Sequence, residues 1–268
     1  MRVNRSNDLP SHMASDESLR DRYLDLVQAT VANKIYGESE IETRLRAWVQ
    51  RLRHPWSTRR GTFSWPAKAH TMLPTQRLDN VRKLVKATLL EGIPGDYIET
   101  GVWRGGTCIL IRAILAAYGV ADRRVICADS FQGLPRPDLA RFRHDKRDRL
   151  YAFSELAVSE EQVRANFATY GLLDEQVVFL KGFFQDTLPN VPSESFALLR
   201  LDGDMYGSTM DALVNLYNKL SMGGYVIIDD YGALNACRRA VHDFLDSRDL
   251  SPTINRIDVS GVWWRKTD

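Results

Sequence analysis

The sequence predicts an α/β fold, in which a doubly wound, mostly parallel β-sheet ends in an antiparallel hairpin and is preceded by a helical N-terminal region. From Gly95 onward, short apolar runs alternate with amphipathic stretches, as strands do with crossover helices. A glycine-rich turn, residues 99–107, follows the first run and opens into an apolar helix. Two acidic clusters, residues 202–204 and 229–230, stand where two later runs end. These features place a ligand crevice at the carboxyl ends of the strands.

The first 94 residues are predicted to form a tail, residues 1–19, followed by a helical lid region, residues 20–94. Residues 1–19 are polar and unpatterned, which is typical of a flexible tail, and His12-Met13 resembles a cloning junction. Helical spacing of apolar residues predicts three helices, at 20–31, 39–52 and 78–90. The loop 54–66 contains Trp56, Phe63 and Trp65, which either cover a site or pack a small satellite core.

Residues 95–268 form the predicted core domain. Its parallel strands are expected at 97–100, 124–128, 177–181, 196–201 and 225–228. The clearest helices are expected at 107–118, 160–170, 208–220 and 236–247. Two short β-type runs, 254–259 and 262–265, flank Ser260-Gly261 and predict the terminal hairpin.

Composition excludes several classes of protein. The chain has 268 residues, of which 44% are hydrophobic, enough for one sizeable core. A net charge of +2 gives no general attraction to nucleic acid or to an anionic membrane. The three cysteines lack metal-ligand spacing and are expected to be reduced core residues. Since no apolar run approaches the ~18 residues of a membrane span, we expect a soluble cytoplasmic protein.

The glycine-rich turn is the first candidate ligand site. Glycine allows a sharp turn and close approach to a ligand, and a helix N-terminus offers N–H groups. The spacing of Gly101 and Gly105 departs from the dinucleotide fingerprint, which begins G-x-G. The acid before the first glycine, Glu99, suits the cationic amino-acid part of S-adenosylmethionine. A plain tight turn is the alternative. In full, the turn reads Glu99-Thr100-Gly101-Val102-Trp103-Arg104-Gly105-Gly106-Thr107.

Two later strand ends extend this candidate site toward a nucleoside. Asp129 ends the second strand roughly 20 residues after the turn, where an acid accepts hydrogen bonds from ribose hydroxyls. A loop or helix-capping acid is the alternative for Asp129. The third strand is followed by Gly182-Phe183-Phe184-Gln185-Asp186, which offers apolar and amide groups to an adenine ring.

The acidic clusters predict a metal site. Adjacent parallel strands bring the carboxylates of Asp202, Asp204, Asp229 and Asp230 together, where they repel unless a proton or cation neutralises them. Oxygen ligands without nearby His or Cys favour a hard cation such as Mg²⁺ over zinc. An Asx turn at the first cluster and a helix cap at the second are the alternatives.

Several motifs are spread over about residues 23–266. They are Leu24-Asp25-Leu26, Ile35-Tyr36-Gly37, Trp65-Pro66-Ala67, Thr71-Met72, Arg77-Leu78-Asp79-Asn80, and the stretches 98–106, 128–135 and 200–206. Together they resemble the macrocin O-methyltransferase family, antibiotic-tailoring enzymes that act with S-adenosylmethionine and Mg²⁺. The resemblance implies a class I methyltransferase fold, related to the Rossmann fold, with a helical N-terminal lid, and it implies a homo-oligomer.

The resemblance also implies roles for the candidate residues. The turn holds the methionine part of the cofactor through Glu99, Gly101 and Gly105, together with Thr100, Trp103, Gly106 and Thr107. Asp129 and Ser130 hold the ribose, and Gly182, Phe184 and Asp186 border the adenine. Asp202, Asp229 and Asp230 are the implied metal ligands, and Asp204 is the implied general base. The family pattern Asp-Gly-Asp-Leu-Tyr-Glu-Ser-Thr differs here at Met205 and Gly207, which we expect to alter the acceptor wall.

The sequence therefore predicts an S-adenosylmethionine- and Mg²⁺-dependent O-methyltransferase that acts on a natural product, first of all on a sugar hydroxyl. A divalent ion activates and orients the hydroxyl while a carboxylate removes its proton. His242, in an amphipathic helix, and His144, in the charged segment 141–147, which is expected to be solvated, are poorer base candidates. A catechol O-methyltransferase and a non-catalytic nucleotide-binding scaffold are the alternatives.

Overall fold

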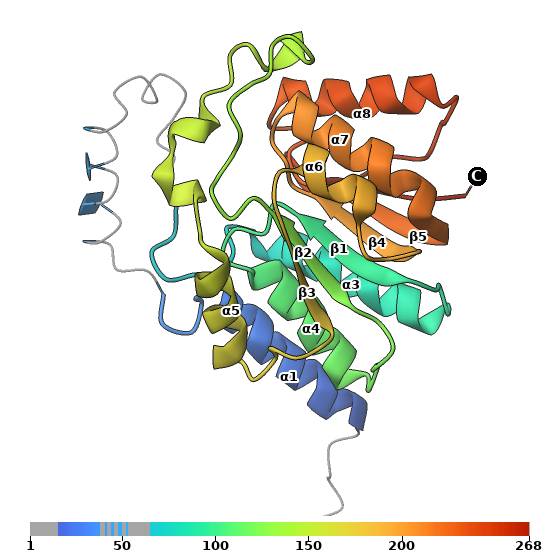
Figure 1. The fold of residues 1–268 in the computed structure, drawn as a ribbon. Helices are drawn as coiled ribbons and strands as arrows, with labels where there is room; N and C mark the ends of the chain where they lie inside the picture. Colours follow the sequence, from blue (N-terminus) through green and yellow to red (C-terminus); the bar gives the residue numbers. More distant parts are fainter. Residues whose placement is uncertain are drawn as a thin grey trace, which may run out of the picture.

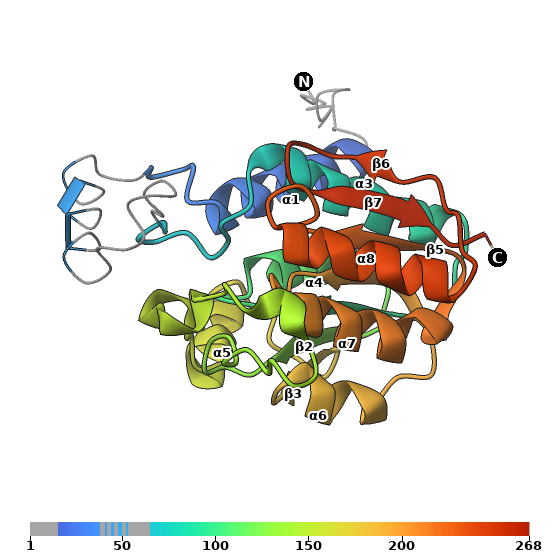
Figure 2. The same ribbon diagram turned by 90° about the horizontal axis from the view of Figure 1, so that it is seen from above.

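A single seven-stranded sheet organises the protein in this computed structural model, which describes residues 16–37, 41, 44–45, 48–49, 52 and 65–267. The strand order is β3-β2-β1-β4-β5-β7-β6 (Figures 1 and 2). β1 to β5 are parallel, β7 runs antiparallel to β5, and β6 antiparallel to β7. The predicted doubly wound sheet with its terminal hairpin is confirmed.

The strands follow the predicted pattern closely. They are β1 (Asp96–Thr100), β2 (Val125–Asp129), β3 (Val177–Lys181), β4 (Phe196–Leu201), β5 (Leu220–Ile228), β6 (Asn255–Arg256) and β7 (Val262–Arg265). β5 begins earlier than expected because Leu220 already pairs with Phe196 of β4. β6 is shorter than expected because the Asp258 carboxylate accepts the N–H groups of Ser260 and Gly261 and closes a turn.

Helices cover both faces of the sheet (Figure 1). They are α1 (Asp16–Val31), α3 (Thr75–Leu90), α4 (Gly106–Ala117), α5 (Glu160–Thr169), α6 (Phe184–Thr187), α7 (Tyr206–Leu216) and α8 (Asn235–Ser247). α1 and α3 pack against α4 on one face, and α7 packs against α8 on the other. None of the helices among the described residues is long and apolar enough to cross a membrane.

Two predicted helix boundaries differ from the structure, and part of the predicted N-terminal region lies outside the described residues. α1 begins at Asp16, so residues 16–19 are helical rather than part of the expected tail. α7 ends at Leu216 and a 3-10 turn, 217–219, replaces the last predicted helical turn. In the predicted helix 39–52 the described positions 41, 44–45, 48–49 and 52 are helical. Trp56 and Phe63 lie outside the described residues.

The core forms two layers because the central strands are buried on both faces. Tyr97 and Leu198 point into the layer beneath α1, α3 and α4, whereas Ile98 and Leu199 point into the layer beneath α7 and α8. Such continuous burial is typical of parallel strands covered by helices on both sides. All three cysteines, Cys108, Cys127 and Cys237, are buried and free, as predicted.

Strand register places the acidic clusters at one edge of the sheet. Thr100 pairs with Leu201, and Leu201 pairs with Ile228. The ladder continues one residue further, because the Asp202 N–H donates to the Thr100 carbonyl (2.9 Å) and the Asp229 N–H to the Leu201 carbonyl (3.0 Å). The glycine-rich turn and both acidic clusters therefore meet at the carboxyl ends of β1, β4 and β5.

Candidate active site

Two adjoining cavities open at this edge of the sheet. The first, of about 210 Å³, lies between Glu99, the acidic clusters and the segment 65–77. The second, of about 90 Å³, lies against Asp129 and Ser130. Residues shared by both linings separate the two cavities, namely Met72, Gly101, Trp103, Leu156, Asp202 and Asp204. We call the first the acidic chamber and the second the nucleoside chamber.

The glycines of the turn allow its close packing against the neighbouring loops. Gly101 has a φ of 85°, and a Cβ added there would lie 1.8 Å from the Asp202 carbonyl oxygen. A Cβ at Gly106 would lie 2.6 Å from the His70 carbonyl oxygen, to which the Gly106 N–H donates (2.9 Å). Both positions therefore require glycine for packing of the protein itself, beyond any contact with a ligand.

Glu99 lines the acidic chamber and is 2% exposed. Its Oε1 accepts from Arg200 Nη1 (2.5 Å), and its Oε2 accepts from the Cys108 thiol (2.8 Å). Burial raises the pKa of Glu99 to about 7 even though Arg200 opposes the shift. Arg200 thus ties the acid of the glycine-rich turn to the strand that carries Asp202.

Asp129 ties the loops that follow β1 and β2 together. Its Oδ2 accepts from the N–H groups of Val102 (2.7 Å) and Trp103 (3.3 Å), and its Oδ1 accepts from the Phe131 N–H (2.8 Å). Burial raises the pKa of Asp129. The residue also lines the nucleoside chamber beside Ser130, where the sequence placed a ribose.

Some of the other predicted cofactor residues line one of the chambers, and others line neither. Gly106 and Thr107 line the acidic chamber, and Trp103 lines both chambers. Phe184 lines the nucleoside chamber with Phe183. Asp186 is exposed and, like Thr100, Gly105 and Gly182, is absent from both linings.

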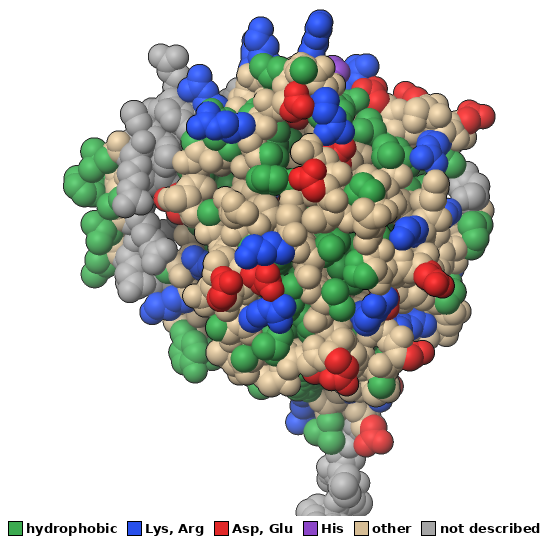
Figure 3. All heavy atoms as spheres, in the orientation of Figure 1, with side chains coloured by type: hydrophobic (Ala, Val, Ile, Leu, Met, Phe, Trp, Pro, Cys, Tyr) green, Lys and Arg blue, Asp and Glu red, His purple; other side chains and the backbone are tan. Residues whose placement is uncertain are grey.

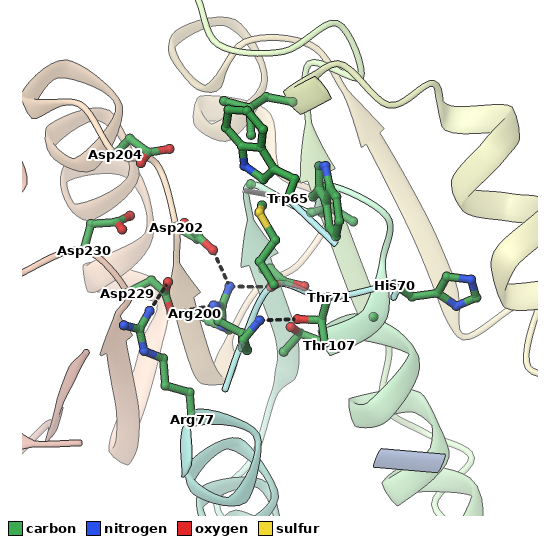
Figure 4. Close-up of a pocket in the computed structure, with 18 of the residues that line it drawn as sticks. Trp65, His70, Thr71, Arg77, Thr107, Arg200, Asp202, Asp204, Asp229 and Asp230 are labelled. Atoms are coloured by element: carbon green, nitrogen blue, oxygen red, sulfur yellow. Dashed lines mark hydrogen bonds and ion pairs between the residues drawn. The ribbon is translucent and has the colours of Figure 1, made fainter. Parts of the chain in front are cut away.

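Asp202, Asp204 and Asp230 converge in the acidic chamber (Figure 4). One carboxylate oxygen of each lies within 4.8 Å of the others. Asp230 Oδ2 is buried without a hydrogen-bond partner, and burial together with the neighbouring acids raises the pKa of Asp204 and Asp230 well above the usual range. An unpaired buried carboxylate oxygen among other carboxylates fits a hard cation.

Asp229 faces two arginines instead. Its Oδ1 accepts from Arg200 Nη2 and its Oδ2 from Arg77 Nη1, both at 2.6 Å (Figure 4). Burial raises the pKa of Asp229 to about 6, with Asp202 adding to the shift and the arginines opposing it. Arg77 belongs to α3 and also binds Asp258 through Nε (2.7 Å). The arginine contacts fix the Asp229 side chain beside the three converging acids.

Asp204 has a strained backbone. Its φ is +57°, in the left-handed region that residues other than glycine seldom adopt. Trp103 (φ 48°) and Phe131 (φ 55°) share this conformation in the loops after β1 and β2. Such strain persists where surrounding structure fixes it, and it often marks functional loops.

One charged segment is packed differently from the prediction. Residues 141–147 were expected to be solvated, yet Asp145 is 1% exposed. Its carboxylate accepts from the N–H groups of Tyr206 and Gly207 at the start of α7. Neither His144 nor His242 lines either chamber. Arg77 and Arg200 were not predicted to have a role, although an arginine inside the apolar run 198–201 was a visible signal.

Residues 20–266 match the model of the macrocin-O-methyltransferase family, TylF. The chain belongs to this family. It is therefore an S-adenosylmethionine-dependent O-methyltransferase, and the non-catalytic scaffold is set aside. The expected family, fold and reaction class are all confirmed.

Curated relatives of this O-methyltransferase cover nearly its full length. The 8-demethyl-8-(2,3-dimethoxy-alpha-L-rhamnosyl)-tetracenomycin-C 4'-O-methyltransferase of Streptomyces olivaceus is 49% identical over 252 residues, 94% of this chain and 95% of the relative. Demethyldecarbamoylnovobiocin O-methyltransferase of Streptomyces niveus is 46% identical over 94% of this chain and 95% of the relative. Mycinamicin III 3''-O-methyltransferase of Micromonospora griseorubida is 45% identical over 91% and 96%, respectively.

Solved structures agree with this assignment. The O-methyltransferase NovP superposes with a TM-score of 0.83 at 45% identity, over 93% of this chain and 100% of NovP. The calicheamicin methyltransferase CalS11 gives a TM-score of 0.58 at 18% identity, over 100% of both chains, and so shares the fold.

Proposed function

We propose that this O-methyltransferase methylates a sugar hydroxyl of a glycosylated natural product and that it uses Mg²⁺. The observation that carries the proposal is the acidic chamber, in which Asp202, Asp204 and Asp230 converge beside Glu99. A relative 49% identical to the chain methylates a rhamnosyl tetracenomycin, which supports a sugar as the acceptor rather than a catechol.

The two chambers divide the cofactor between them. We assign the methionine part to the acidic chamber, with Glu99 and the turn 101–107, and the ribose to Asp129 and Ser130. The adenine ring then lies against Phe184, an apolar face suited to stacking. Gly101 and Trp103, which line both chambers, come to lie beside the reactive end of the cofactor.

The proposed metal ligands are Asp202, Asp229 and Asp230. Asp230 fits because its buried Oδ2 has no partner, and Asp202 fits because it lies beside Asp230. Each oxygen of Asp229 accepts one arginine N–H and keeps a second lone pair, so it completes the set without losing Arg77 or Arg200. Bound Mg²⁺ supplies Lewis acidity that lowers the pKa of an acceptor hydroxyl.

Asp204 is the proposed general base. It lies two residues beyond Asp202 on the same loop and lines both chambers. Its raised pKa favours acceptance of a proton from the acceptor hydroxyl as that oxygen attacks the sulfonium methyl. Because the methyl is already electrophilic, the rest of the site has to align donor and acceptor and exclude water.

The N-terminal region 20–94 is proposed to cover the acceptor side of the site. Trp65, Met72, Leu73 and Arg77 come from this region and line the acidic chamber. On α1, Leu19 and Leu26 are 55% and 58% exposed, which supports assembly with further copies of the chain.

An acceptor panel tests the proposal. The purified enzyme is incubated with S-adenosylmethionine, Mg²⁺ and the acceptors of the three relatives, and with simple catechols, and products are read by mass spectrometry. We expect a gain of one methyl on the sugar of at least one glycoside. Methylation of catechols alone would support the aromatic alternative, and binding of S-adenosylhomocysteine without any methylated product would contradict the proposal.

A further inference from the structure

A basic segment between β2 and α5 passes over the carboxyl edge of the sheet. Residues 141–156, which we call the strap, contain three 3-10 turns, 143–145, 150–152 and 154–156. In Figure 1 their yellow-green turns run from above α5 to the top of the view, above α7 and α8, and Figure 2 shows the same segment from above. Figure 3 shows Lys and Arg side chains gathered over this part of the molecule. Despite this charge, the strap is docked at several points.

Asp145 docks one end of the strap on α7. Its Oδ1 accepts from the Tyr206 N–H (2.7 Å) and its Oδ2 from the Gly207 N–H (2.9 Å). These N–H groups belong to the first turn of α7, which has no side-chain cap of its own at Met205. Both oxygens of this buried carboxylate thus accept N–H groups at the N-terminus of α7, which is the positive end of the helix dipole.

Gly207 leaves the space that this docking needs. A Cβ at Gly207 would lie 2.6 Å from Phe142 Cδ2 and 3.3 Å from Asp145 Oδ2. The Phe142 ring also packs on the Tyr206 ring, with centroids 5.6 Å apart. Gly207 is not among the glycines with positive φ. An alanine at this position would therefore clash with the strap without straining its own backbone.

The other end of the strap forms a wall of the site. Leu150 lines the acidic chamber together with Asp204 and Asp230, and Leu156 lines both chambers. The Glu155 carbonyl accepts from Trp103 Nε1 (2.9 Å), and the Phe153 ring lies edge-on to Trp65 at 4.9 Å. The strap therefore spans from α7, which begins two residues after Asp204, to the residues around the glycine-rich turn.

We propose that Asp145 is a positioning residue, which clamps the strap to α7 through the space left by Gly207 and thereby sets the Leu150 and Leu156 wall against the Asp202–Asp204 loop. This inference rests on the proposed function in one respect, that the acidic chamber receives the acceptor. The clamp determines how tightly an acceptor binds, and it acts on the nucleoside chamber less, because Leu156 is the one strap residue in that lining, whereas Asp129, Ser130 and Phe184 lie outside the strap.

Asp145→Asn removes one of the two acceptor oxygens, whereas Asp138→Asn is a matched control. Asp138 is exposed and accepts from Ala140 and Arg141 through a single oxygen, which asparagine retains. Limited trypsin digestion reads the clamp directly, since residues 141–149 include five Lys or Arg. We expect Asp145→Asn to speed cleavage in the strap about tenfold, with Asp138→Asn unchanged.

Steric rescue provides the second test. Gly207→Ala should also speed strap cleavage, and adding Phe142→Ala should restore protection to the level of Phe142→Ala alone. In the double variant the close contact that remains is the 3.3 Å between the new Cβ at position 207 and Asp145 Oδ2. A shift of a few tenths of an ångström relieves this contact.

Kinetics separate positioning from general stability. With an acceptor that the wild-type enzyme methylates, Asp145→Asn should raise the acceptor KM about tenfold and weaken S-adenosylhomocysteine binding by a clearly smaller factor. Unchanged strap cleavage in Asp145→Asn would overturn the proposal, as would equal losses of acceptor and cofactor binding. If no acceptor is methylated by the wild type, the proposed function fails while the trypsin and rescue experiments still decide the clamp.

Discussion

Arg200 Nη1 lies 2.5 Å from Glu99 Oε1, so a buried guanidinium on β4 neutralises the acid that ends β1. The same guanidinium reaches Asp202 (3.0 Å) and Asp229 (2.6 Å). Arg200 thus joins the proposed methionine site to the proposed metal site. Since three carboxylates share one cation here, the balance of charge in the acidic chamber depends on this side chain.

Removal of Arg200 should destabilise the fold strongly. Arg200→Met removes the cation shared by the buried Glu99 and Asp229 and the half-buried Asp202, and we expect the free energy of unfolding to fall by about 3–5 kcal/mol. Urea denaturation measures the change. Arg239→Met is the control, because its pair with Asp243 on the surface of α8 contributes about 0–1 kcal/mol. Equal effects of the two variants would refute the role of Arg200.

The close approach of the loops after β1 and β4 should make Gly101 irreplaceable. Gly101→Ala adds a Cβ 1.8 Å from the Asp202 carbonyl to the strain of a positive φ, and we expect a loss of about 2–4 kcal/mol. Gly119 also has a positive φ but has nothing within 4 Å, so Gly119→Ala should cost only about 1 kcal/mol. Thermal unfolding compares the pair, and similar losses would show that the loop contact is unimportant.

Substitutions of the proposed base and of a proposed metal ligand should have different kinetic effects. Asp204→Asn should lower kcat by about 10²–10⁴-fold, since the acceptor loses its base, with the Mg²⁺ requirement retained. Asp230→Asn should instead raise the Mg²⁺ concentration needed for half-maximal rate. S-adenosylhomocysteine affinity, measured by calorimetry, should stay near the wild-type value in both. Full activity of Asp204→Asn would exclude it as the base.

Acid should weaken the ion pair between α4 and the loop before β3. Asp174 binds Arg112 with both oxygens, and this hydrogen bonding lowers the pKa of Asp174. Because the folded pKa lies below the unfolded value, the stabilisation is present above about pH 4 and is lost as the pH falls through the folded pKa. Asp174→Asn should therefore cost about 1 kcal/mol at neutral pH and less in acid. A cost independent of pH in urea denaturation would contradict this.

The sheet was predictable because its signals are local. Buried parallel strands appear as apolar runs such as 196–201, and helix α4 follows the glycine-rich turn directly. The acids at strand ends were also predictable, since parallel topology alone brings them to one edge.

Side-chain partners were less predictable because they depend on residues far apart in the chain. Nothing near Asp145 in the sequence indicates that its carboxylate accepts a hydrogen bond from the start of α7. A run of charged residues is instead typical of a solvated surface. Arg77 meets Asp229 across 152 positions. Asp186 lies exposed on the short helix α6, outside both chamber linings, and its place beside an adenine stays a prediction.

Dependence of methyl transfer on Mg²⁺ tests the central claim most directly. The wild-type enzyme is stripped with EDTA, and transfer from S-adenosylmethionine to a methylated acceptor of the glycoside panel is followed by mass spectrometry as Mg²⁺ is restored. We predict that turnover disappears without the ion and returns with it, while S-adenosylhomocysteine still binds the stripped enzyme. Undiminished turnover in EDTA would contradict the assignment of Asp202, Asp229 and Asp230 as a catalytic metal site.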